Sequence, residues 1–229
     1  MRVEEYLSEK EQWEAVKAWV RENGLWIVAG VAVGAAGLGA WNWYHGHVDE
    51  IGSQASAKYN QVLDAFAHDD RTHAFVALGE LEREYSSSPY VDQGKLAAAR
   101  VYVESSELDK AAKELQDVAQ HSRDTELVIV AKLRLARVQI AQHKADDALA
   151  TLNSLEPGAF GPRYHEVRGD AYYAKGDKAQ ALKEYLSAKV GDLEQTFDDP
   201  DLELKISDLT GDKPAEPKQP AAPPTAAAK

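Results

Sequence analysis

An uncharged apolar stretch near the start of the sequence constrains this chain more than any other feature. Residues 25–44 read LWIVAGVAVGAAGLGAWNWY and contain no Lys, Arg, Asp, Glu or His. A helix of this length is about 30 Å long, the hydrocarbon thickness of a bilayer, and a single span through lipid has to be helical. Trp26 lies near one end and Trp41, Trp43 and Tyr44 near the other, where amphipathic rings favour the membrane interface. The sequence therefore predicts one transmembrane helix.

Two other interpretations of this stretch stay open. It could be a buried core helix of a soluble protein, although such helices are usually shorter. It could also be a cleaved signal peptide with a cleavage site among the small residues 37–40. Against cleavage, the apolar region is long and the segment 1–24 before it contains six Glu.

Basic residues near the span predict its orientation, because they are retained on the cytoplasmic side. After the span, the first Lys or Arg is Lys58. Before the span there are four, at Arg2, Lys10, Lys17 and Arg21. We therefore expect residues 1–24 to be a cytoplasmic amphipathic head, with a helix over 2–22 that stops at Asn23-Gly24 before the span. The domain that follows is then translocated.

Small residues line one face of the predicted span. Gly30 and Gly34 form a G-x-x-x-G pair, and Gly37 continues the same face. Small residues at this spacing allow two membrane helices to approach closely. The stripe predicts a packing face for another membrane helix, with a plain Gly/Ala-rich anchor as the alternative.

Residues 45–209 show the pattern of an all-α domain built from successive helix pairs. The expected helices are 49–67, 72–85, 92–105, 108–120, 125–142, 145–155, 163–175, 178–190 and 200–209. Gly176 is placed to end one helix, and Asp177 with Gln180, like Ser106 with Asp109, is placed to cap the next.

The last helix pair carries a repeat signature. Tetratricopeptide spacing is matched by Gly169, Tyr172, Gly176, Ala181, Tyr185 and Ala188. Small and apolar residues recur at equivalent places in the two preceding pairs, first Ala136, Ala148, Leu152 and Leu155, and before them Ala99, Tyr102, Ala111, Leu115 and Val118. Repeats of this kind stack helix pairs into a continuous core. We therefore expect a tetratricopeptide-like domain, with an irregular helical bundle as the alternative.

Composition and motifs exclude several classes of function. The chain has no Cys and a net charge of −12, which argue against thiol chemistry and nucleic-acid binding. No hydrolase, phosphate-loop, metalloprotease or dinucleotide motif occurs. The acidic run around Pro200, with Asp198, Asp199, Asp201 and Glu203, fits a helix N-terminus better than a calcium loop. We expect no enzyme, cofactor, metal site or small-molecule substrate.

A surface for other proteins remains as the candidate site. In this repeat class, the first helix of each pair builds the concave face. The candidate groove residues are Leu96, Arg100, Val103, Leu133, Arg137, Ile140, Arg163, Glu166, Asp170 and Tyr173. The alternative is that the arginines only pair with neighbouring acids. Residues 210–229 are rich in Pro and Ala and are expected to be a disordered tail.

Several short motifs follow one another in a specific order along residues 4–209. They are Glu14-Ala15-Val16-Lys17, Glu22-Asn23-Gly24, the run LRLARV at 133–138, Arg168-Gly169-Asp170 and Lys175-Gly176-Asp177-Lys178. Together they resemble the YfgM family, ancillary subunits of the bacterial SecYEG translocon. The resemblance implies an inner-membrane protein with its N-terminus inside and a periplasmic tetratricopeptide-like domain. It also implies SecYEG and the membrane-anchored chaperone PpiD as partners, with secretory clients passed on to periplasmic chaperones.

A second functional class also fits the sequence. A membrane-anchored tetratricopeptide protein could be the scaffold of another envelope complex, such as one for division or wall assembly. The residues alone do not separate this role from that of a translocon adaptor.

Overall fold

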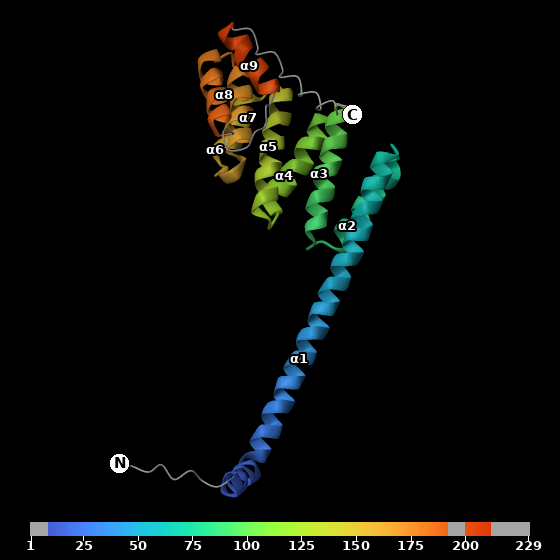
Figure 1. Cartoon of the computed structure of the whole chain (residues 1–229). Helices are drawn as coiled ribbons and strands as arrows, with labels where there is room; N and C mark the ends of the chain where they lie inside the picture. Colours follow the sequence, from blue (N-terminus) through green and yellow to red (C-terminus); the bar gives the residue numbers. More distant parts are fainter. Residues whose placement is uncertain (1–8, 192–199, 212–229) are drawn as a thin grey trace, which may run out of the picture. The chain divides into compact units, whose positions relative to one another are not determined.

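The computed structural model describes residues 9–191 and 200–211, and within them every regular element is helical (Figure 1). The elements are α1 Glu9–Ala67, α2 Arg71–Glu84, α3 Pro89–Glu104, α4 Leu108–His121, α5 Thr125–Ala141, α6 Ala145–Asn153, the short 3-10 helix η1 Gly158–Phe160, α7 Gly161–Ala174, α8 Lys178–Gly191 and α9 Pro200–Thr210. The predicted all-α class is confirmed. The predicted tail lies almost wholly outside the described residues.

Contacts divide the chain into two units, Met1–Ala55 and Ser56–Lys229. Helix α1 runs without a break from Glu9, in the predicted head, through the span to Ala67, so the predicted helix stop at Asn23-Gly24 is wrong. The side-chain amide of Asn23 donates to the carbonyl of Trp19, 3.0 Å away, within the continuing helix. Two weak helix formers in a row cost only about 1–2 kcal/mol, too little to interrupt a helix that continues on both sides.

The apolar part of α1 is long and apolar enough to cross a membrane, by length and composition. Its most apolar window has a mean hydropathy of 1.7, and none of that window is buried. Trp26 is 78% exposed, and Val33 and Trp43 are each 73% exposed. A core helix would be covered by the rest of the domain, so the interpretation as a soluble core helix does not hold.

The turn inside each helix pair repeats in the structure as it does in the sequence. Each contains one residue with positive φ: Asp69 (58°), Ser106 (61°), His143 (62°) and Gly176 (83°). The first three are evenly spaced along the chain, and the step to the fourth is slightly shorter. The next residue donates its N–H back into the first helix, as Asp177 does to the Tyr172 carbonyl at 3.0 Å. This is the Schellman arrangement that ends helices, and it confirms the repeat register.

The two predicted caps have different outcomes. Asp177 accepts the N–H of Gln180 at 3.1 Å, as predicted. The prediction for Ser106 is wrong, because this residue adopts the left-handed conformation that closes α3. Glu107 takes the N-cap position of α4 and makes no side-chain capping bond there.

The first helices of the pairs form an inner layer. Each of α3 to α8 packs on the next, and in addition α3 contacts α5, and α5 contacts α7. Two apolar clusters fill the space between the layers, one joining α3, α4 and α5, and the other joining α5, α6 and α7. Side chains on the exposed side of α3, α5 and α7 therefore share one face.

Helix α9 completes the domain after α8. It begins at Pro200 with Asp201 and Glu203 in its first turn, as the acidic run predicts. Leu202 packs against Ala181, Tyr185 and Ala188 of α8. The other two acids of that run, at positions 198 and 199, lie outside the described residues.

Candidate functional site

The predicted groove residues lie on the inner layer, but the structure separates them into three groups. Leu96 and Leu133 are buried in the two core clusters, and Ile140 packs partly buried against the second. Leucine at these positions supports the inner layer from the core side, so it is not available to a partner. Helical periodicity assigns residues to one face of a helix, but it does not show which residues of that face are buried and which are exposed.

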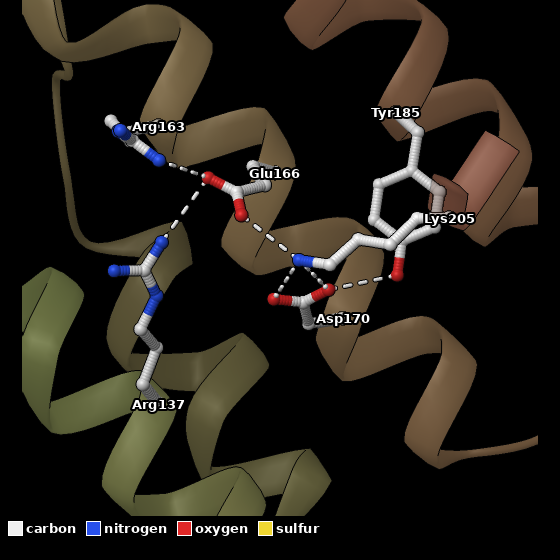
Figure 2. Close-up of polar contacts among 6 residues, drawn as sticks. All are labelled: Arg137, Arg163, Glu166, Asp170, Tyr185 and Lys205. Carbon is white, nitrogen blue, oxygen red and sulfur yellow. Dashed lines mark hydrogen bonds and ion pairs between the residues drawn. The ribbon is translucent and has the colours of Figure 1, made fainter. Parts of the chain in front are cut away.

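The second group is an ion-pair network centred on Glu166 of α7 (Figure 2). The carboxylate of Glu166 is only 8% exposed. Its Oε2 atom accepts hydrogen bonds from the guanidinium groups of Arg137 in α5, at 3.2 Å, and of Arg163 in its own helix, at 2.9 Å. Lys205 of α9 reaches its other oxygen at 2.9 Å. The network therefore joins three helices through one buried acid.

Lys205 extends the network to a second acid. Its ammonium group lies 2.8 Å from Asp170 Oδ1, and the hydroxyl of Tyr185 donates to the same oxygen at 2.8 Å. Further along α9, Asp208 accepts a hydrogen bond from the Tyr173 hydroxyl at 3.3 Å. These contacts place α9 against the inner face of the last repeat. The predicted groove is filled at this end by the chain itself.

The charges of the network stabilise one another. Burial opposes ionisation of Glu166, but Lys205, Arg163 and Arg137 outweigh it and hold the pKa of this carboxyl below its ordinary value. Burial likewise disfavours the charged form of Lys205, yet Asp170 and Glu166 raise its pKa. Burial, followed by the charge of Asp170, raises the pKa of Tyr185. At neutral pH Glu166 is therefore ionised and Tyr185 keeps its proton.

The third group lines an open pocket between α3, α4 and α5. Its volume is about 350 Å³. The apolar part of the lining consists of Ala99, Val103, Leu108, Leu115, Val138 and Ala141. Three arginines complete it: Arg100, Arg134 and Arg137. Two of these, Arg100 and Arg137, were predicted from the sequence together with Val103.

The three arginines differ in their ion-pair partners. Arg100 pairs with Glu104 one turn along α3 at 2.8 Å, an exposed pair. Arg137 reaches Glu166. Arg134 has no ion pair or hydrogen bond to any residue that the structure describes. Arg134 is exposed at the pocket mouth, and its partial loss of solvent, reinforced by the charges of Arg100 and Arg137, lowers its pKa.

Sequence reasoning missed Arg134 as a groove residue. Its position less than one helical turn before Arg137 puts the two side chains on neighbouring places of one helix face, and this spacing was a usable signal. Within the described part of the chain, no group of three or more potential metal ligands occurs. The open part of the inner face thus offers apolar surface and positive charge.

Comparisons with known proteins agree with the architecture. A family model described as a tetratricopeptide repeat-like domain matches residues 17–211. A protein of Escherichia coli (strain K12) named "Ancillary SecYEG translocon subunit" is 30% identical over 208 residues, which cover 91% of this chain and 100% of that protein. Proteins of the same name from Aggregatibacter actinomycetemcomitans and Haemophilus influenzae are 30% and 27% identical, and cover 89% and 80% of this chain and 98% and 89% of their own lengths. No solved structure gives a significant match.

Proposed function

Because the chain belongs to the tetratricopeptide repeat-like family of ancillary SecYEG translocon subunits, we propose that it is a membrane-anchored adaptor at the translocon. The observation that carries this proposal is the full-length relation to proteins of that name, which includes both the span and the repeats. The resemblance found in the sequence motifs is the same one. The role is a binding role, in which the repeats and the span contact other proteins and no reaction is catalysed.

The proposed topology follows from the charges around the span. The N-terminal head is cytoplasmic, the apolar part of α1 crosses the inner membrane once, and the domain of residues 45–209 lies in the periplasm. In this orientation the inner face of the repeats meets proteins that leave the translocon. Handover of these clients to periplasmic chaperones, with PpiD as the neighbouring partner, is the finer part of the proposal and is supported by the family resemblance alone.

Site-specific photo-crosslinking tests the proposal and separates it from an envelope scaffold. A photoreactive residue replaces Gly34, in the apolar part of α1, or Val103, whose side chain is 42% exposed at the open pocket. The expected adducts are a SecYEG subunit from position 34 and a stalled secretory chain from position 103. A third position, Ala179, lies exposed on α8 away from the inner layer and is the control. Adducts with division or wall-assembly proteins, and none with SecYEG or a secretory chain, would contradict the proposal.

A further inference from the structure

We infer that the pocket between α3, α4 and α5 binds an acidic, leucine-bearing segment of a partner protein, with Arg134 receiving a carboxylate of that segment. The inference deepens the proposed function and rests on it only for the use of the repeats as a protein-binding surface. The pocket, about 350 Å³ in volume, is at the lower end of the roughly 300–1,000 Å³ typical of ligand sites. Most of the residues around it are apolar, which suits aliphatic side chains of the bound segment.

The charge of the occupant follows from the arginines. Arg100, Arg134 and Arg137 gather at one pocket of a chain whose net charge is −12. Like charges held close together cost free energy, and an anion between them removes that cost. Arg134 is the side chain best placed to gain, since no residue in the described ranges neutralises it. A guanidinium group also binds a carboxylate through two parallel hydrogen bonds.

In the last repeat, the position equivalent to Arg100 and Arg137 is already paired with a charge of opposite sign. Arg100, Arg137 and Asp170 occupy equivalent places in successive pairs, each at the same distance before the positive-φ residue that closes its helix. At the acidic one, Asp170, α9 supplies the cation Lys205 (Figure 2). Arg137 and Glu166 form the border between the filled end and the open pocket. Where the inner face carries arginines instead, the complementary partner has to carry carboxylates.

The occupant is therefore a segment that combines both features. Carboxylates alone would leave the apolar lining in water, and leucines alone would leave Arg134 without an ion pair. A nucleic acid also carries negative charge, but its row of phosphates needs a wider basic surface than the three arginines of this pocket. The segment belongs to a partner protein, and the pocket recognises its alternation of acidic and aliphatic side chains.

Fluorescence anisotropy with the full-length protein in mild detergent tests the inference. The probe is a fluorescein-labelled synthetic peptide that alternates leucine and glutamate. Two comparison peptides replace either the glutamates by glutamine or the leucines by serine. The expected result is saturable binding of the leucine–glutamate peptide and at least tenfold weaker binding of both others, because each lacks one of the two features.

Two arginine variants locate the binding. Arg134→Gln should weaken the leucine–glutamate peptide about tenfold, as expected for the loss of a hydrogen bond between charged groups. Arg123→Gln is the matched control, since Arg123 is also exposed but lies at a different pocket, lined by Asp117 and His121. Equal affinities for the two variants, equal binding of all three peptides, or no binding would overturn the inference. None of these outcomes involves SecYEG, so crosslinking at position 34 still judges the proposed function separately.

Discussion

Gly169 of α7 lies directly against the ring of Tyr185 of α8. A Cβ atom placed at position 169 would come within 2.4 Å of Tyr185 Cε1 and 2.5 Å of Cδ1. The ring cannot move aside easily, because Tyr185 is 2% exposed and its hydroxyl donates to Asp170. The glycine that the repeat spacing identified is therefore a packing requirement, and the pair sets how closely the two helices approach.

Gly169→Ala should lower the free energy of unfolding by about 1–3 kcal/mol, the usual cost of overpacking a tight core. Urea unfolding followed by circular dichroism measures the change. Gly79→Ala is the control, because a Cβ at that exposed helical glycine meets no atom within 4 Å in the described part of the chain. Alanine there should stabilise α2 by about 0.5–1 kcal/mol. The same loss of stability in both variants would contradict the role of close approach.

Ala181→Leu tests the core beneath the last helix pair. Ala181 is fully buried beside Tyr185 and Leu202, so the larger side chain should force α8 and α9 apart and cost about 1–3 kcal/mol. Ala179→Leu, slightly earlier in the same helix, puts the same side chain in solvent and should change little. Thermal melts of the two variants should differ clearly. Identical melting would contradict a tight contact at Ala181.

Lys205→Met tests the network that attaches α9. At neutral pH the variant should lose about 1–3 kcal/mol of stability, because Glu166 and Asp170 each lose a charged hydrogen bond. The contribution of Glu166, whose folded pKa is lowered, is complete above its ordinary value of 4.5 and is lost as the pH falls through the folded value. The contribution of Lys205, whose pKa is raised, is lost only as the pH rises through its folded value above 10.5.

The measurement for this variant is urea unfolding at pH 7 and at a series of acidic values. The difference between wild type and Lys205→Met should be largest at neutral pH and should shrink below pH 4.5, as Glu166 becomes protonated in both. Lys189→Met removes an exposed pair with Glu203 and should change stability by less than about 1 kcal/mol. A constant difference across the pH series would show that the lysine acts through packing alone.

The sequence was sufficient for the helix pairs and their register, because small residues and turns recur at regular intervals. It was less informative about the inner face. Helical periodicity placed Leu133 and Arg137 on one side of α5, but only packing shows that the first is buried. That α9 would turn back and give Lys205 to Glu166 depends on a contact between residues 39 positions apart, for which no local pattern exists. Arg134 was overlooked because it directly follows Leu133 and is not one of the positions that recur from pair to pair.

The proposed orientation predicts a periplasmic C-terminus. Alkaline phosphatase fused after Lys229 should be active in cells, because this enzyme needs the oxidising periplasm to form its disulfides. The physical reason is the cluster of basic residues before the span, compared with none after it until Lys58. A reporter that is active only in the cytoplasm, fused at the same place, should be inactive. The reverse pair of results would reverse the topology.

The stripe Gly30, Gly34 and Gly37 predicts that the span recognises another helix. A Cβ at any of the three meets no atom of residues 9–191 or 200–211 within 4 Å, so these parts of the chain leave the stripe open to a partner. Gly34→Leu should leave membrane insertion intact, since leucine favours lipid, and weaken association by about 1–2 kcal/mol by preventing close approach. Co-purification of membrane partners in mild detergent compares wild type, Gly34→Leu and the control Leu38→Ile. Equal recovery by all three would leave the span as an anchor only and move the partner surface to the repeats.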